Sequence, residues 1–237
     1  MTDEISILVP TYNRSKFLPL FLMNIKGQLY QHDKLTVIIY DDSKDERFID
    51  DSHFDEVRRI LHPIKLVYKI GQSKLSIGRK RDALSKMCKT KIFTFLDDDD
   101  IYLPTFITHN YETLKNGKYG CVGSDKMLFC MTDKDYSVHA IDCGNTVHMI
   151  HEATLMATKK WYRSTCGFAD SSRGEGANLF HNINKSSIGI TDIRELMVCV
   201  QHGGNTVDKL QFAKDENRVN IEMNQEMINI LETILKN

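Results

Sequence analysis

Residues 92–100, IFTFLDDDD, join an apolar run to four consecutive aspartates. A short run of this kind is typical of a buried strand, so the aspartates lie at its carboxyl end. In open α/β sheets, ligands bind beyond the carboxyl ends of the strands. Carboxylates this close together repel one another, which favours a bound divalent cation or protonation. The stretch therefore predicts a metal-assisted site for a ligand that carries phosphates; the alternative interpretation is a solvated acidic turn.

The chain on either side of this run alternates between strand and helix patterns. In the first half, strands are expected at residues 5–9, 35–40 and 64–70, and helices at 16–29, 50–60 and 76–88. Repeated βαβ units of this kind predict a mainly parallel sheet covered by helices. The pattern becomes less regular near residue 120, which is the candidate boundary between lobes. Beyond it, strands are expected at residues 119–131, 136–143, 152–158 and 196–200, and helices from about 177 and in the tail.

Composition and charge narrow the classes of function. The 237 residues suit one large domain, or one domain with a small lobe. With 31 Lys and Arg against 32 Asp and Glu, the formal net charge is −1, so no overall field attracts nucleic acid or an anionic membrane. No apolar stretch reaches the roughly 18 residues of a membrane span, and the acidic start is unlike a signal peptide, so we expect a cytoplasmic protein. The six cysteines form no CxxC pair, which favours reduced thiols, although an even number also allows disulfides.

Polar residues also follow the first two predicted strands. In residues 10–14, PTYNR, the ring of Tyr12 could stack on a base and Arg14 could reach a phosphate. After the second strand, Asp41 and Asp42 could accept hydrogen bonds from a base or a ribose hydroxyl. Taken singly, the first segment is equally an ordinary loop and the second a turn that caps a helix. They gain weight because neighbouring strand ends converge on one crevice.

Three further groups are candidates for the same crevice. In residues 78–82, GRKRD, either Arg79 or Arg81 could hold a diphosphate or brace the aspartates. Glu175 lies between two glycines, directly before a predicted helix, and could act as a general base or simply favour the helix terminus. His202 follows a predicted strand and could complete a metal site, although a lone histidine is more often structural.

These segments, in this order, resemble the family 2 inverting glycosyltransferases, which have the GT-A fold. The resemblance is carried by the stretches ILVPTYNR (7–14), IIYDDSKD (38–45), GRKRDA (78–83) and FLDDDD (95–100). It implies an α/β chain of GT-A type, with a mainly parallel, Rossmann-like sheet flanked by helices as the nucleotide-binding half and a smaller mixed half for the acceptor. The implied divisions of this single compact domain are a donor half at 1–120, an acceptor and catalytic half at 121–207 and a helical tail at 208–237.

The resemblance also implies which residues bind the donor, a nucleoside-diphosphate sugar, with a UDP-sugar favoured. The residues that would contact it are Pro10, Thr11, Tyr12, Arg14, Asp41, Asp42, Arg81, Asp97 and Asp98. The cofactor would be Mn²⁺ or Mg²⁺, held by Asp99, as in the family's Asp-x-Asp pattern, and by His202. The register within the four aspartates is ambiguous, so Asp98 and Asp100 are further candidate ligands.

The catalytic base implied by the resemblance belongs to a Glu-Asp pair, which reads Glu175-Gly176 here. Glu175 would deprotonate a hydroxyl of a glycan or glycoconjugate acceptor in a single displacement that inverts the sugar, with Asp170 and Glu152 as reserves. Two alternatives stay open. A nucleotidyltransferase that makes nucleotide sugars also needs a carboxylate-bound metal, but residues 10–14 lack the glycine-rich loop typical of such enzymes. A non-catalytic relative that binds nucleotide sugars would keep the fold without turnover.

Overall fold

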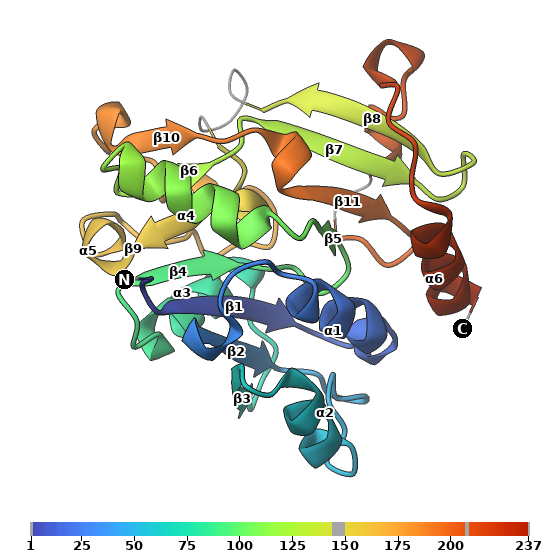
Figure 1. Cartoon of the computed structure of the whole chain (residues 1–237), viewed down its shortest axis with the longest axis horizontal. Helices are drawn as coiled ribbons and strands as arrows, with labels where there is room; N and C mark the ends of the chain where they lie inside the picture. The colour runs from blue at the N-terminus through green and yellow to red at the C-terminus, as the bar shows by residue number, and fades with distance from the viewer. Residues whose placement is uncertain (1, 144–149, 207–208, 237) are drawn as a thin grey trace.

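The computed structural model describes residues 2–143, 150–206 and 209–236, and its strands form two sheets (Figure 1). The larger sheet has the order β10-β6-β9-β4-β1-β2-β3, and the smaller has the order β5-β11-β7-β8. The strands of the larger sheet are β1 (Ile5–Thr11), β2 (Leu35–Asp41), β3 (Lys65–Ile70), β4 (Ile92–Phe95), β6 (Cys121–Gly123), β9 (Met156–Thr158) and β10 (Ile188–Ile190). Those of the smaller sheet are β5 (Ile101–Tyr102), β7 (Lys126–Met131), β8 (Ser137–Asp142) and β11 (Met197–Gln201).

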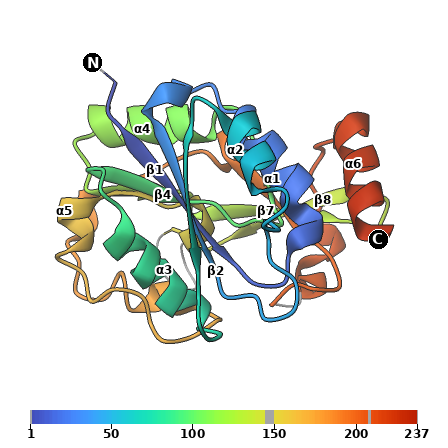
Figure 2. The same cartoon turned by 90° about the horizontal axis from the view of Figure 1, so that it is seen from below.

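Helices α1 to α5 cover both faces of the larger sheet, and α6 lies beside the smaller sheet (Figure 1). Their bounds are α1 (Leu18–Lys26), α2 (Phe54–Leu61), α3 (Ile77–Met87), α4 (Phe106–Asn116), α5 (Lys159–Tyr162) and α6 (Gln225–Lys236). Figure 2 shows α1, α2 and α4 on one face and α3 and α5 on the other. The alternation along β1 explains this arrangement, because Ile7 and Val9 pack in the core cluster of α1 and α2, whereas Leu8 packs in that of α3.

The centre of the larger sheet is parallel, as the βαβ pattern predicts. β1 pairs in parallel with β2 on one side and with β4 on the other, and β2 pairs in parallel with β3. The register places Ile5 beside both Leu35 and Ile92, so the three strands run in step. Their carboxyl ends therefore reach the same edge of the sheet, and the loops after them are neighbours.

Strands from the second half of the chain extend this sheet. β9 lies antiparallel between β4 and β6, and β10 pairs in parallel with β6. The proposed boundary near residue 120 thus falls between strands of a single sheet. The other proposed boundary, between residues 207 and 208, lies outside the described residues.

Two helices differ from the sequence prediction. A helix starting near residue 177 was expected, but only the 3-10 turn η5 (Glu175–Ala177) forms there, followed by further turns. The prediction is wrong because Gly174, which adopts a left-handed φ of 61°, and Gly176 disfavour a helical start. Conversely, α4 was not expected, because Thr and Asn residues weaken its helix propensity. Its burial of Phe106, Ile107 and Leu114 overrides that preference.

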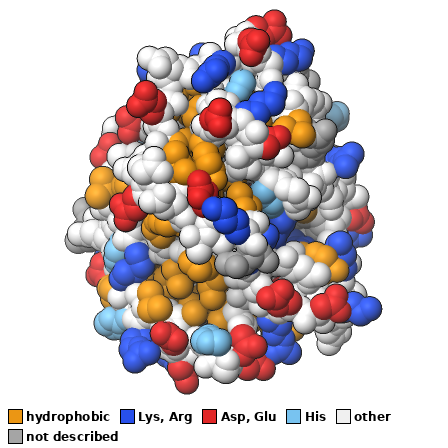
Figure 3. Space-filling view, turned by 90° about the vertical axis from the view of Figure 1, so that its right-hand side faces the viewer, with side chains coloured by type: hydrophobic (Ala, Val, Ile, Leu, Met, Phe, Trp, Pro, Cys, Tyr) orange, Lys and Arg blue, Asp and Glu red, His pale blue; other side chains and the backbone are white. Residues whose placement is uncertain are grey.

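The hydrophobicity of the helices and the distribution of surface charge can be compared with the requirements for spanning a membrane and for binding nucleic acid. Across the described ranges, no helix is both long enough and apolar enough to span a bilayer. The face to the right of Figure 1 carries acidic and basic side chains interspersed around apolar areas (Figure 3). That face therefore presents no single-sign field of the kind that binds nucleic acid nonspecifically.

Candidate active site

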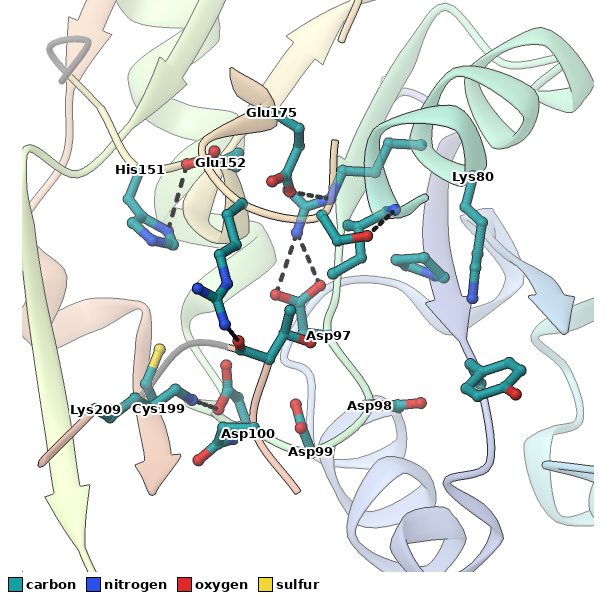
Figure 4. A pocket seen from close by; sticks show the side chains of 18 of the residues that line it. Lys80, Asp97, Asp98, Asp99, Asp100, His151, Glu152, Glu175, Cys199 and Lys209 are labelled. Carbon is teal, nitrogen blue, oxygen red and sulfur yellow. Dashed lines mark hydrogen bonds and ion pairs between the residues drawn. The ribbon is translucent and has the colours of Figure 1, made fainter. Parts of the chain in front are cut away.

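A cavity of about 970 Å³ lies beyond the carboxyl ends of β1 and β4, between them and the second half of the chain. Figure 4 shows many of its side chains converging from both halves. The predicted residues that line it are Pro10, Thr11, Tyr12, Arg14, Arg81, Asp97, Asp98, Asp99 and Glu175. The remaining predicted residues, Asp41, Asp42 and His202, lie outside this lining, although Asp42 contacts Lys80 and His202 contacts Asp99, which belong to it. Nine of the residues predicted from the sequence thus lie on one cavity wall, and their individual roles stay predictions.

Asp99 is paired with two positive or polar groups from distant parts of the chain. Its Oδ2 lies 2.9 Å from Nε2 of His202 and 3.3 Å from the guanidinium of Arg14. The N–H of Gly204 donates to Nδ1 of His202, so in a neutral imidazole the proton on Nε2 points at Asp99. Burial alone would raise the pKa of Asp99, but the hydrogen bond from His202 and the charges of Lys209 and Arg14 hold it below its usual value. Asp99 is therefore the aspartate of the run best kept ionised.

Asp99 offers an ionised carboxylate to a divalent cation, with His202 as its neighbour. Nε2 of His202 and Oδ2 of Asp99 are hydrogen-bonded at 2.9 Å, so His202 can bind a cation only if its proton leaves Nε2. No group of three or more His, Cys, Asp or Glu residues gathers into a metal site within the described ranges. A carboxylate with few protein co-ligands suits Mg²⁺-type sites, which are completed by substrate phosphates and water.

The neighbouring aspartates, Asp98 and Asp100, differ in their contacts. Asp100 accepts a hydrogen bond from the N–H of Val200 at 2.8 Å and an ion pair from Lys209 at 3.2 Å, so its carboxylate ties the run to β11. Asp98 is 5% exposed, and its Oδ2 has no hydrogen-bond partner among the residues described. Burial, with the adjacent charge of Asp99, raises the pKa of Asp98 well above its usual value. Asp98 is thus the aspartate most in need of a proton or a cation.

Arg81 links the aspartate run to the predicted base. One guanidinium nitrogen lies 3.0 Å from Asp97, and Nε lies 3.5 Å from Glu175 (Figure 4). The guanidinium is buried, and it stacks over the rings of Phe95 and Phe168, at 5.1 and 5.8 Å from their centroids. Of the two roles that the sequence left open for this arginine, bracing carboxylates is the one that these contacts describe.

Glu175 is a buried carboxylate on the cavity wall, with 7% of its side chain exposed. Burial raises its pKa; the charge of Arg81 opposes this, and that of Glu152 reinforces it. Its position depends on Gly78 in α3, where a Cβ would lie 1.9 Å from the carbonyl oxygen of Ala169 and 3.1 Å from Cβ of Glu175. A carboxylate with a raised proton affinity and access to the cavity is suited to act as a general base.

Asp41 and Asp42, at the end of β2, support the loops that form the donor wall. Both oxygens of Asp41 bind its own loop, accepting from the backbone N–H groups of Ser43 at 2.8 Å and Phe48 at 2.7 Å. Asp42 is buried against Nζ of Lys80 at 2.5 Å, and Lys80 in turn donates to the carbonyl oxygen of Thr11 at 2.7 Å. A direct contact of Asp41 or Asp42 with the base stays a prediction. What the structure describes is a support for the loop that carries Tyr12.

Sequence reasoning did not single out four cations that line the cavity. Lys80 is described above, and Lys74 lies 3.9 Å over the ring of Tyr12. Arg173 donates to the carbonyl oxygen of Thr206, and Lys209 binds Asp100. Only Lys80 had a local signal, its place in the GRKRD segment, because the other three depend on tertiary contacts. The wall contributed by the second half is otherwise largely apolar and includes Phe129, Ile141, Cys143, Ile150 and Phe212.

The family of the chain follows from comparison with known proteins. The family model described as "Glycosyl transferase family 2" matches residues 6–172, which contain β1, the aspartate run and most of the cavity wall. The chain belongs to glycosyl transferase family 2. Among curated proteins, none matches this family 2 chain. The match confirms the family inferred from the four sequence stretches.

Solved structures confirm the GT-A fold of this family 2 chain. S. aureus TarS is 15% identical at a TM-score of 0.63, over 84% of this chain and 37% of that chain. S. aureus TarS 1-349 in complex with UDP-GlcNAc is 13% identical at a TM-score of 0.64, over 98% of this chain and 65% of that chain. Mannosyltransferase PcManGT from Pyrobaculum calidifontis, in complex with GDP-Man and Mn²⁺, is 18% identical at a TM-score of 0.59, over 85% and 57%. The chain thus spans less than two thirds of the length of each of these structures.

Proposed function

We propose that the chain is a metal-dependent, inverting glycosyltransferase that moves a sugar from a nucleoside-diphosphate sugar to an acceptor hydroxyl. The observation that carries the proposal is that one cavity holds both a buried carboxylate of raised pKa, Glu175, and an ionised carboxylate, Asp99. The first suits proton removal, and the second suits a cation that faces phosphates. Membership in glycosyl transferase family 2 supports this assignment.

The donor half of the cavity would bind the nucleotide. Pro10, Thr11 and Tyr12 line the wall at the end of β1, where the ring of Tyr12 would stack on a base through the face that Lys74 leaves open. Asp97 and Asp98 lie next to it at the end of β4 and offer acceptors to ribose hydroxyls. The structures of TarS with UDP and with UDP-GlcNAc favour a UDP-sugar as the first donor to test, and that of PcManGT makes GDP-mannose the second.

Asp99 and His202 would hold Mn²⁺ or Mg²⁺, and Arg14, 3.3 Å from Asp99, would lie beside the diphosphate. When bound, such a cation neutralises charge on the departing diphosphate as a Lewis acid. The presence of Mn²⁺ in the PcManGT complex supports this choice of cofactor. Arg81 would act indirectly, because its contacts are with Asp97 and Glu175.

The chemistry assigned to the protein is a single displacement. The carboxylate of Glu175 takes the proton of an acceptor hydroxyl as the hydroxyl oxygen forms a bond to the anomeric carbon. The bond from that carbon to the diphosphate oxygen breaks, and the nucleoside diphosphate leaves with the electron pair. Because attack comes from the face opposite the leaving group, the configuration of the sugar inverts. The acceptor is a glycan or glycoconjugate hydroxyl that enters past the apolar wall of the second half.

Nucleotide binding is the first experimental test. Melting temperatures would be measured with UDP, GDP, dTDP and CDP, each with and without Mn²⁺, because a ligand of the native state alone raises the melting temperature. We expect one nucleotide to stabilise the protein only when Mn²⁺ is present. Release of that nucleotide from its sugar, with an inverted product seen by NMR, would complete the test. A folded protein that responds to no nucleotide with metal would overturn the proposal.

A further inference from the structure

The carboxylate of Glu152 fills the space beside Gly176, the residue that follows the proposed base. Glu152 opens the 3-10 turn η4 (Glu152–Thr154) and is 8% exposed. Its Oε1 accepts a hydrogen bond from the N–H of Gly176 at 3.0 Å. A Cβ on residue 176 would lie 2.7 Å from that oxygen and 2.9 Å from Cδ of Glu152. A side chain could therefore enter at 176 only by displacing this carboxylate.

Glu152 keeps its charge in this buried position. Burial alone would raise its pKa, but the positive charges of His151 and Arg81 and the hydrogen bond from Gly176 together lower it below the usual value. Nδ1 of His151 lies 3.9 Å from the other oxygen, Oε2. Glu152 is therefore ionised at neutral pH, close to a second carboxylate, that of Glu175.

The charged and titratable groups around this carboxylate come from three further places in the fold. Arg81 approaches from α3, Glu175 from η5 and the thiol of Cys143 from the end of β8, while Asp97, at the end of β4, acts on the neighbouring Glu175. Arg81 is the cation that contacts Glu175, at 3.5 Å, and it is shared with Asp97. The negative charge at Glu152 adds to the excess of carboxylates and raises the pKa of Glu175.

We propose that Glu152 is a positioning residue for the base: its carboxylate fixes the turn that carries Glu175 and keeps a negative charge beside it. The inference rests on the proposed function, in which Glu175 takes the acceptor proton. Glu152 is suited to this role because the hydrogen bond from Gly176 engages Oε1, and the backbone that it fixes carries the neighbouring residue. A residue 23 positions earlier in the chain thus controls the proton affinity and the placement of the base.

The primary test compares Glu152→Gln with Glu112→Gln, an exposed glutamate on α4, as the matched control. Glutamine keeps the size and the oxygen acceptor for the N–H of Gly176 but removes the charge. The pKa of Glu175 then falls, so the acid limb of the kcat–pH profile moves to lower pH. At neutral pH, kcat falls roughly 3- to 10-fold because the base is weaker. Glu112→Gln should leave both the profile and kcat unchanged.

A second test moves the carboxylate from residue 152 to residue 176. Glu152→Ala should lower kcat more than Glu152→Gln, because it also removes the hydrogen bond to the turn. Gly176→Asp should also lower kcat, because its Cβ meets the Glu152 carboxylate. In the double variant Glu152→Ala/Gly176→Asp, the new carboxylate enters the vacated space. We expect kcat to rise above both single variants and the acid limb to return towards higher pH.

The outcomes separate this inference from the proposed function. Nucleotide-dependent stabilisation by the UDP–Mn²⁺ or GDP–Mn²⁺ pair serves as the folding control for every variant, since the direct partners of the Glu152 carboxylate, Gly176 and His151, belong to the second half of the chain. If Glu152→Gln binds nucleotide but leaves the acid limb and kcat unchanged, the positioning role is wrong. If Glu175→Gln itself retains wild-type transfer, the assignment of the base fails, whatever Glu152→Gln does.

Discussion

Asp99, after β4, and Glu175, in η5, are both largely shielded from solvent, yet their charges are compensated differently. Asp99 has His202 and Arg14 as partners, and Asp100 has Lys209. Glu175 and Glu152, by contrast, have the charge of Arg81 in common, and Arg81 also pairs with Asp97.

The balance of charge distinguishes the chemistry of Asp99 from that of Glu175. Compensation by three positive or polar partners lowers the pKa of Asp99, so its carboxylate stays available to a cation. Burial, reinforced by the charge of Glu152 and opposed by that of Arg81, raises the pKa of Glu175, so its carboxylate holds a proton more readily than a free glutamate. Neighbouring carboxylates in one cavity thereby acquire the two roles that the proposed transfer needs, one at the diphosphate and one at the acceptor.

The largest effect is expected from removing the proposed base, Glu175. Glu175→Gln removes the proton acceptor and should lower kcat by about 10²- to 10⁴-fold, the usual contribution of a positioned base. Stabilisation by nucleotide and Mn²⁺ should stay as in the wild type, because the donor wall is untouched. The measurement is single-turnover transfer alongside thermal shift. Transfer that survives this change would point to another base, with Asp170→Asn as the next variant to assay.

The next effect tests the dependence of the donor half on buried cations. Lys80→Met leaves the carboxylate of Asp42 buried without its partner, and the side chains of the two are 4% and 0% exposed. Breaking a buried ion pair in this way should lower the free energy of unfolding by about 3–5 kcal/mol. Lys74→Met, which removes a cation above the ring of Tyr12, is the control and should change stability far less. Urea unfolding of both variants decides the point, and equal losses would contradict it.

A third variant addresses the metal side. Asp99→Asn removes the charge that faces the cation and should weaken Mn²⁺-dependent nucleotide binding on the order of 10²-fold, a few kcal/mol. Asp98→Asn is the informative comparison, because the buried Oδ2 of Asp98 has no hydrogen-bond partner among the described residues. Titration calorimetry with UDP and Mn²⁺ measures both. A larger loss from Asp98→Asn would shift the metal ligand by one position in the run.

The pH dependence of the two regions should separate. Glu175 has a raised pKa and must be deprotonated to act, so transfer declines as the pH falls through that pKa. Asp99 has a lowered pKa and stays ionised at that pH, so binding of the nucleotide sugar with Mn²⁺ should persist where transfer has already declined. Parallel profiles of kcat and of binding test this order. Coincident acid limbs would mean that the two regions are not distinguished by charge compensation.

The smallest effect is expected at the edge of the cavity. Asp170 pairs with Arg79 at 3.0 Å, but both side chains are more than 60% exposed. Exposed pairs of this kind contribute little to stability. Asp170→Asn should therefore change neither the melting temperature nor transfer measurably. A strong loss of transfer would reinstate Asp170 as a candidate for the base.

Much of the donor half could be predicted from the sequence, because parallel strands place their ends side by side. The apolar runs that became β1, β2 and β4 deliver Tyr12, Asp42 and Asp99 in an order that the chain alone determines. The role of each residue within a cluster could not be predicted from the sequence. The pairing of Asp99 depends on His202, which is 103 residues away, and the contact of Arg81 with Asp97 depends on the fold.

The second half resisted prediction for a related reason. Its short strands and 3-10 turns have little periodicity, so local pattern says little about where a side chain points. The Glu175-Gly176 pair was visible as a departure from the family pattern, but its physical cause was not. That cause, the Glu152 carboxylate against Gly176, is a contact between segments 24 residues apart.

The aspartate run also connects the two sheets. β4 ends at Phe95 in the larger sheet, and β5 begins at Ile101 in the smaller one, so the run is most of the crossover between them. At its end, Asp100 fastens to Val200 of β11. The length of this crossover must therefore match the distance between the two sheets, whatever the charge of its residues. A point substitution at Asp98 preserves that span, whereas one inserted or deleted residue would shift the strands on both sides out of register.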